Sequence, residues 1–155
     1  MRLPSVFQSI VLAVMFLGAG GFPVVAPEAA QLYAATELKA VNGGHFVVKA
    51  DINGSDVMVL VDTGATTVAL SYEDAQTVGL HPNSLTYDVP VSTANGVVNA
   101  ARISLSKIEI DGVRVRDVPG MVLPEGAMRG SLLGMSFLSR LSGFKVEDGV
   151  LYLKN

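Results

Sequence analysis

The stretch that decides the fold reads Val57-Met58-Val59-Leu60-Val61-Asp62-Thr63-Gly64. Its five consecutive apolar residues predict a buried β-strand, and the glycine that follows predicts a tight turn. The strand therefore delivers a carboxylate, that of Asp62, into apolar surroundings. Burying an ionised aspartate costs free energy unless another group shares or pairs its charge. We therefore interpret Asp62 as a functional carboxylate rather than an ordinary turn residue.

Asn-Gly and Asp-Gly pairs punctuate the chain from residue 41 onward. These residues tolerate the positive φ angles of tight turns, and alternating apolar residues flank them as in β-hairpins. The four pairs are Asn53-Gly54, Asn95-Gly96, Asp111-Gly112 and Asp148-Gly149. Together they predict an all-β, mostly antiparallel fold.

Two short helices are expected within this β-rich part. Ser71 can cap the first helix, an acidic residue follows three positions later at Asp74, and Gly79 can end it. The second is expected from Met135 to Leu141. With about two turns, it depends on packing against the rest of the protein for its stability.

The first 26 residues differ from the rest. Arg2 precedes an uncharged, mostly apolar stretch, the order found in export signals, and this stretch is also long enough to cross a bilayer. A cleaved signal peptide and a transmembrane anchor both remain open for residues 1–26. We expect a linker at residues 27–40 and a folded domain at residues 41–155. Either alternative places that domain in the cell envelope, as a membrane-anchored domain outside the cytoplasm or as a periplasmic protein.

Composition excludes several classes of function. The chain has 155 residues, a net charge of −3 and no basic cluster, which argues against a nucleic-acid partner. It contains no cysteine, so thiol catalysis and disulfides are excluded. His45 and His81 are isolated from each other and from any acidic cluster. We therefore expect neither a metal site nor a cofactor.

The Asp62-Thr63-Gly64 turn resembles the active-site turn of retropepsin-like aspartic proteases. Two further segments match that family in order: the hairpin from Val89 to Ile103, at the position of the flap, and Leu132-Leu133-Gly134, before a short helix. The resemblance covers residues 41–155 and is greatest to bacterial, membrane-tethered or exported members. It implies a closed acid-protease barrel with a flap hairpin and one or two short helices.

The resemblance also implies a mechanism. Two carboxyl groups hold one water, and one acts as base while the other acts as acid. The sequence has a single Asp-Thr-Gly, so one chain cannot supply both carboxyls. We expect a homodimer in which the two copies of Asp62 meet at a two-fold axis. Gly64 lets the turn close, and the resemblance implies that the Thr63 hydroxyl bonds across the axis, so the catalytic assignment is Asp62, Thr63 and Gly64.

Substrate binding is assigned to the turn, the flap tip and the segment beside the turn: Ala65, Ala94, Asn95, Gly96, Leu133 and Gly134. Subsites for apolar peptide side chains are expected at Val91, Val97, Leu133 and Met135. Many acid-active relatives have serine where this chain has Ala65. Without that hydroxyl to support the ionised carboxylate, we expect a less acidic pH optimum than in pepsin-like enzymes.

A second interpretation belongs to another functional class. The same fold could serve as a non-catalytic dimerisation or peptide-binding module of the cell envelope. The intact Asp62-Thr63-Gly64 favours the peptidase, because a purely structural module gains nothing from a pair of adjacent carboxyls.

Overall fold

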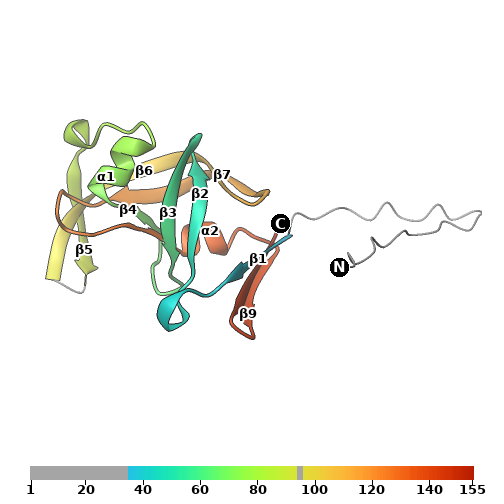
Figure 1. Ribbon diagram of the computed structural model, residues 1–155. Coiled ribbons are helices and arrows are strands. Elements are labelled where there is room, and N and C mark those ends of the chain that lie inside the picture. The colour runs from blue at the N-terminus through green and yellow to red at the C-terminus, as the bar shows by residue number, and fades with distance from the viewer. Residues whose placement is uncertain (1–34, 94–95) are drawn as a thin grey trace, which may run out of the picture. The chain divides into compact units, whose positions relative to one another are not determined.

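A barrel of β-strands forms the folded domain (Figure 1). The computed structural model describes residues 35–93 and 96–155. In this part of the chain, one sheet has the strand order β2–β3–β8–β4–β7–β6–β5, and a further pairing of β2 with β6 closes it. The strands are β2 (Val47–Ile52), β3 (Ser55–Val61), β4 (Val68–Leu70), β5 (Tyr87–Thr93), β6 (Gly96–Ile110), β7 (Val113–Val122) and β8 (Ser131–Leu133). The predicted all-β closed barrel is confirmed.

The hairpin turns lie where the sequence predicts them. Three are described: Asn53-Gly54, Asp111-Gly112 and Asp148-Gly149. At the first, both residues have positive φ, 55° for Asn53 and 93° for Gly54, as a tight hairpin turn requires. The flap hairpin is formed by β5 and β6, which pair from Tyr87 to Thr93. Its tip includes Asn95, which lies outside the described residues.

Two short α-helices accompany the barrel. The first, α1 (Tyr72–Thr77), begins as predicted, because the Ser71 hydroxyl accepts a hydrogen bond from the Asp74 N–H at 3.1 Å. The second, α2 (Met135–Leu138), is shorter than expected and continues only as single turns to Leu141. Two 3₁₀ turns, η1 (Asn42–Gly44) and η2 (Pro82–Ser84), complete the helical elements of the described residues.

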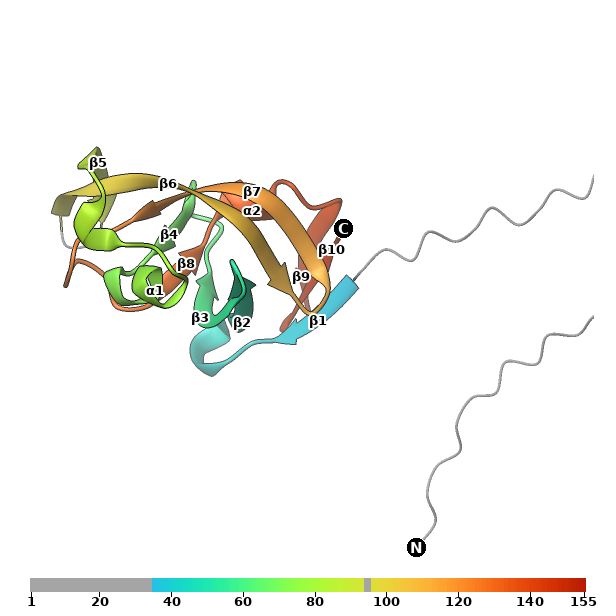
Figure 2. The same cartoon turned by 90° about the horizontal axis from the view of Figure 1, so that it is seen from above.

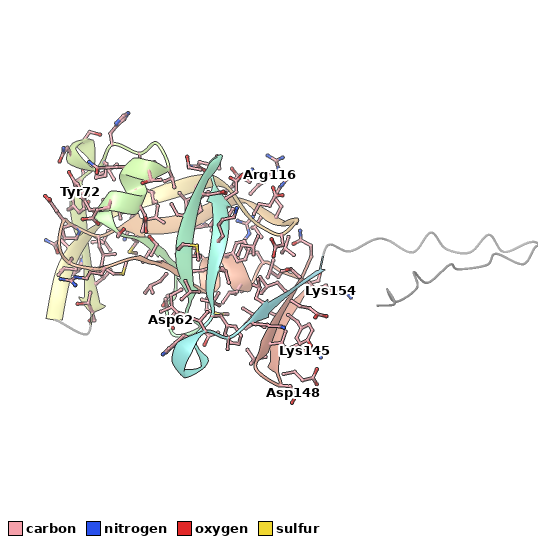
Figure 3. The ribbon with its side chains drawn as sticks, viewed as in Figure 1. Asp62, Tyr72, Arg116, Lys145, Asp148 and Lys154 are labelled. Atoms are coloured by element: carbon pink, nitrogen blue, oxygen red, sulfur yellow. The ribbon has the colours of Figure 1, made fainter. Side chains whose placement is uncertain are left out.

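A smaller antiparallel sheet has the order β1–β10–β9, with β1 (Ala35–Lys39), β9 (Gly143–Glu147) and β10 (Val150–Lys154). It lies at the opposite end of the domain from β5 in both ribbon views (Figures 1 and 2). Lys145 and Lys154 of this sheet, and Asp148 in the turn between β9 and β10, are exposed (Figure 3). The sequence placed residues 35–39 in a linker. They form a strand instead, because β10 supplies backbone partners that no local pattern reveals.

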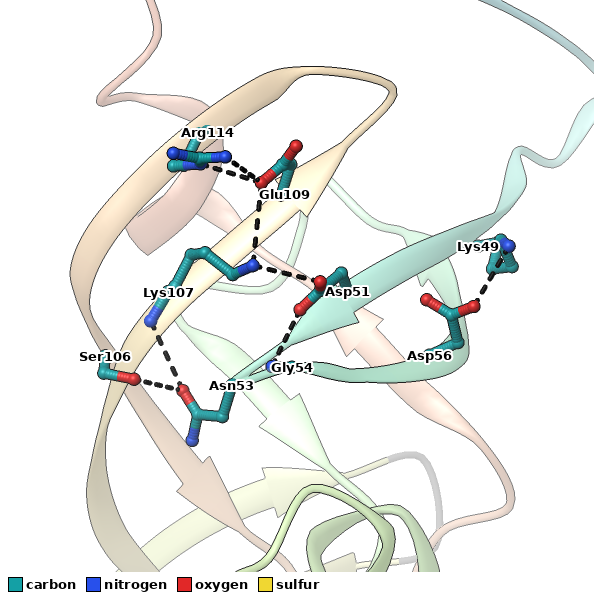
Figure 4. Close-up of polar contacts among 9 residues, drawn as sticks. All are labelled: Lys49, Asp51, Asn53, Gly54, Asp56, Ser106, Lys107, Glu109 and Arg114. Atoms are coloured by element: carbon teal, nitrogen blue, oxygen red, sulfur yellow. Dashed lines mark hydrogen bonds and ion pairs between the residues drawn. The ribbon is translucent and has the colours of Figure 1, made fainter.

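A polar network on β2, β6 and β7 accompanies the closure of the barrel (Figure 4). Lys107 Nζ donates to Asp51 Oδ2 at 3.0 Å, and Arg114 pairs with Glu109 at 2.7 Å. The Lys107 ammonium and the Gly54 N–H hold the pKa of Asp51 below its ordinary value. Each charge of this closure therefore has a partner of opposite sign.

Apolar side chains fill the barrel interior. Phe137 of α2 is fully buried there together with Ile52, Leu105 and Ile108. Leu153 of the small sheet belongs to the same core, so the two sheets pack as one folded unit. Within the residues that the structure describes, no helix is long and apolar enough to cross a membrane. The predicted signal or anchor at residues 1–26 lies outside that range.

Candidate active site

Asp62 lies directly after β3, at the start of the glycine turn (Figure 3). Its N–H donates to the carbonyl of Leu133 at 3.1 Å, which continues the pairing of β3 with β8 by one residue. Its Oδ1 accepts a hydrogen bond of 2.8 Å from the Gly64 N–H. A Cβ on Gly64 would lie 3.1 Å from the same oxygen, so glycine gives the carboxylate its space. The side chain is half-buried.

The strands on both sides of the turn pair with β8. Val61 lies beside Leu133 in a parallel pairing, and Ala69 lies opposite Leu132 in an antiparallel one. Because β8 lies between β3 and β4 in the sheet, the loop from Asp62 to Thr67 must reverse the chain direction and pass the end of β8. The pairing of these three strands therefore fixes where the turn begins and ends.

The segment after β8 binds the turn through its backbone. The N–H of Met135 donates to the Ala65 carbonyl at 2.8 Å, and the N–H of Ser136 donates to the Thr66 carbonyl at 3.0 Å. Gly134 permits this approach, because a Cβ there would lie 2.3 Å from the Thr67 carbonyl oxygen. Only glycine fits at this position without moving the turn.

Ser136 ties the turn to a third strand. Its hydroxyl accepts from the Val68 N–H at 2.9 Å and donates to the Pro119 carbonyl of β7 at 2.7 Å. This role of Ser136 was not predicted from the sequence. Its signal in the sequence is a serine two positions after a glycine at the start of a helix, a pattern too common to identify a bridge between β4 and β7.

A cavity of about 1060 Å³ opens beside the turn. Three segments supply most of its wall: the turn with β4, the end of β5 in the flap hairpin, and the loop of residues 123–130 between β7 and β8. One residue each of β7 and β8 completes it. Its lining residues are Asp62, Gly64, Ala65, Thr66, Thr67, Ala69, Val91, Ser92, Thr93, Met121, Leu123, Gly126, Ala127, Met128, Arg129 and Leu132. Asp62 is the one carboxylate among these described residues, and the cavity is large enough for several side chains of a bound peptide.

Only some of the residues expected to bind substrate line the cavity. Ala65 and Val91 line the cavity. Leu133 is fully buried in the core, so its neighbour Leu132 lines the cavity in its place. Gly134 is also buried, and its role in the structure is to allow the close approach to the turn.

None of the remaining expected residues that the structure describes, Gly96, Val97 and Met135, lines the cavity. Ala94 and Asn95 lie outside the described residues. Gly96 begins β6 with a φ of 112° and does not line the cavity. Val97 is 69 % exposed and Met135 packs against the core, so the structure places neither of these expected subsite residues at the cavity.

The loop of residues 123–130 is the part of the cavity that sequence reasoning missed. It contributes a set of five lining residues: Leu123, Gly126, Ala127, Met128 and Arg129. A signal was present, since Pro124, Gly126 and Gly130 mark an irregular loop directly before Leu-Leu-Gly. The described residues hold no cluster of histidine and acidic side chains that could bind a metal ion.

The family model of gag-polyprotein putative aspartyl proteases matches residues 48–140. The chain belongs to this family. A crystal structure of a retropepsin-like aspartic protease from Rickettsia conorii is 35% identical, covers 79% of this chain and 91% of its own, and superposes with a TM-score of 0.71. The EIAV protease in complex with an inhibitor, at 20% identity, shares the fold with a TM-score of 0.53 over 65% of this chain and 91% of its own.

Two curated relatives are longer than this retropepsin-like chain. A Sinorhizobium sp. protein from the cobV 5′ region is 42% identical over 118 residues, which are 76% of this chain and 51% of the relative. Protein RP867 of Rickettsia prowazekii is 41% identical over 110 residues, 71% of this chain and 47% of the relative. The chain thus spans about half the length of both.

Proposed function

We propose that this chain is an aspartic endopeptidase that works as a homodimer. The observation that carries the proposal is the half-buried Asp62 carboxylate, fixed by a glycine turn at the edge of a large cavity in a retropepsin-like fold. The R. conorii structure, described as a retropepsin-like aspartic protease, supports the same activity. Catalytic roles follow for Asp62, Thr63 and Gly64.

A dimer is required by the chemistry. The reaction needs a base and an acid on opposite sides of one water. Asp62 is the one carboxylate among the described residues of the cavity, and the sequence contains no second Asp-Thr-Gly. A second copy related by a two-fold axis supplies the missing group. Thr63, which is exposed in the single chain, is then available for a contact across that axis.

The proposed reaction is hydrolysis without a covalent intermediate. The ionised Asp62 of one chain takes a proton from water, and the hydroxyl oxygen attacks the carbonyl carbon of the peptide. The protonated Asp62 of the partner gives its proton to the amide nitrogen as the C–N bond breaks. The products are a carboxyl and an amine. The flap hairpin of β5 and β6 would close over the peptide and exclude water.

The N-terminal segment sets the proposed location. The export-signal pattern at residues 1–26 leads us to propose that the domain acts in the cell envelope, on peptides or unfolded protein segments. A fusion of residues 1–40 to alkaline phosphatase, which is active only after export, tests this. Phosphatase activity in whole cells is expected, and its absence would contradict the proposed location.

Peptide cleavage tests the activity. A generic peptide library should be cleaved by the wild-type chain, and both pepstatin and Asp62→Asn should stop the reaction. Equal proteolysis by wild type and Asp62→Asn would contradict the proposal. A folded dimer that binds peptides without cleaving them would support the alternative, a non-catalytic module.

A further inference from the structure

The loop of residues 123–130 brings a positive charge to the cavity. Among the described lining residues, Asp62 and Arg129 are the ionisable ones, and the others offer apolar groups, hydroxyls or backbone. Asp62 is the acidic group of the cavity, and its carboxylate is negative when it is ionised. Arg129 reverses that sign locally, at the wall formed by the loop.

The guanidinium of Arg129 has no ion pair or hydrogen bond with any described residue. Arg102 and Arg116 share this property but do not line the cavity, whereas Arg114 and Arg140 have partners. Arg114 pairs with Glu109 at 2.7 Å, and Arg140 donates to the Asp117 carbonyl at 2.9 Å. Arg129 is exposed at the cavity wall, with all of its N–H donors available. Such a group matches a carboxylate through two parallel hydrogen bonds.

Both ends of the loop are anchored, so the place of Arg129 is defined. At the start of the loop, the N–H of Leu123 donates to the Leu70 carbonyl at 3.0 Å. At its end, the Ser131 hydroxyl accepts from the Ser71 N–H at 3.0 Å and donates to Asp74 at 2.6 Å. Arg129 lies two residues before this buried anchor. The backbone at Arg129 therefore lies close to a fixed point of the loop, and its side chain lines the cavity.

We propose that Arg129 selects substrates that carry a carboxylate in the subsite beside the 123–130 loop. The preferred peptide has a glutamate or aspartate side chain near the cleaved bond, with apolar neighbours that suit Met128 and Leu132. This inference rests on the proposed peptidase function and adds a substrate class to it. Because Arg129 is exposed, solvent weakens the attraction, and salt reduces it further.

Matched peptides test the inference on the full chain. A series with both ends blocked carries one glutamate or one glutamine at successive positions around the cleaved bond. At one position the wild type should prefer glutamate, with kcat/KM higher by about two- to ten-fold. The ratio should fall towards one in 0.5 M salt. Arg129→Gln should remove the preference, and Arg129→Glu should reverse it in favour of a lysine peptide.

The control removes a positive charge elsewhere. Arg116 is an exposed arginine of β7 that does not line the cavity, so Arg116→Gln should keep the glutamate preference of the wild type (Figure 3). A parallel arm compares peptides with a free and an amidated C-terminus. If only the free terminus raises kcat/KM, the carboxylate that binds is the peptide end, and the proposed side-chain preference is wrong.

The two proposals fail in different ways. Cleavage with equal kcat/KM for the glutamate and glutamine peptides at every position would overturn the role of Arg129 and leave the peptidase intact. Absence of all cleavage would overturn the peptidase. In that case, the role of Arg129 is tested by the binding affinity of the same peptides with a reduced, uncleavable bond. Tighter binding of the glutamate peptide that is lost in Arg129→Gln would support the proposed role of Arg129. Equal affinities for the glutamate and glutamine peptides would refute it.

Discussion

Asp51 and Asp62 each lie beside a glycine turn in this molecule, Asp51 near the end of β2 and Asp62 directly after β3, but they have different surroundings. Each carboxylate accepts a 2.8 Å hydrogen bond from the N–H of a glycine that follows closely, Gly54 for Asp51 and Gly64 for Asp62. Asp51 Oδ2 also accepts a hydrogen bond of 3.0 Å from Lys107 Nζ (Figure 4). Asp62 has no cation partner among the described residues and instead lines the large cavity.

The difference shows how an aspartate beside a glycine turn becomes available for chemistry. At Asp51 the ammonium of Lys107 compensates the charge, and the carboxylate helps to close the barrel between β2 and β6. At Asp62 the scaffold binds the backbone of the turn and leaves the carboxylate to face the cavity. The first aspartate is built for structure, and the second is the one we expect to react.

The largest effect is expected when the two aspartates are exchanged for asparagine. Asp62→Asn should lower kcat by at least about 10²–10⁴-fold, because the dyad loses an acid–base group. Its melting temperature should stay unchanged or rise, since the variant removes two crowded acidic groups that serve activity rather than stability. Asp51→Asn should keep its activity. The pair is compared by peptide cleavage and thermal unfolding, and a large loss of stability in Asp62→Asn would identify Asp62 as a structural residue.

The second expected effect concerns the backbone beneath Asp62. Gly134→Ala places a methyl group 2.3 Å from the Thr67 carbonyl oxygen, so the turn must move. We expect the free energy of unfolding to fall by about 1–3 kcal/mol or more. We also expect a loss of peptidase activity, because the turn that carries Asp62 is displaced. Gly143→Ala is the control, because no atom lies within 4 Å of its added methyl. Urea unfolding measures both, and equal stabilities would contradict the proposed close packing.

The third effect concerns the bridge at Ser136. Ser136→Ala leaves the buried N–H of Val68 without its partner, which should cost about 1–3 kcal/mol. Ser139→Ala is the matched control, since its exposed hydroxyl bonds only to the Met135 carbonyl of its own helix. Denaturant midpoints compare the two variants. If Ser139→Ala costs as much as Ser136→Ala, the bridge has no special role.

The smallest expected effect is the pH dependence of the stability that Asp51 contributes where the barrel closes. Lys107 and the Gly54 N–H lower the pKa of Asp51 below 3.8 in the folded protein. The stabilisation is therefore complete above the unfolded-state pKa and is lost as pH falls through the folded-state pKa. Wild type should melt slightly above Asp51→Asn at pH 7, and this gap should close between pH 4 and the folded-state pKa.

Asp56→Asn is the control for this pH series. It removes an exposed ion pair with Lys49, which contributes little at any pH. The test measures the melting temperatures of wild type, Asp51→Asn and Asp56→Asn from pH 7 to pH 2. A gap between wild type and Asp51→Asn that widens on acidification would contradict the assignment.

Local sequence patterns predicted the features that depend on neighbouring residues. The apolar run before Asp62 predicted β3, and the turn residues predicted three described hairpins. The serine cap predicted the start of α1. In each case a few consecutive residues contain the physical cause, such as tolerance of positive φ or a side-chain cap.

Features that depend on distant segments were not predicted. The pairing of β1 with β10 joins residues more than a hundred positions apart. The choice between Leu132 and Leu133 for the cavity depends on the register of β8, since a shift of one residue exchanges the two faces of a strand. Arg129 was missed because an irregular loop has no period that assigns its side chains to a face.

The central claim is that one chain holds half of an active site. It is tested by measuring molar mass by sedimentation and specific activity on the same full-length sample, across a dilution series. We predict that activity per chain falls in proportion to the fraction of dimer, and that an excess of Asp62→Asn suppresses the wild type by forming mixed dimers. Constant specific activity in samples that contain only monomer would contradict the account.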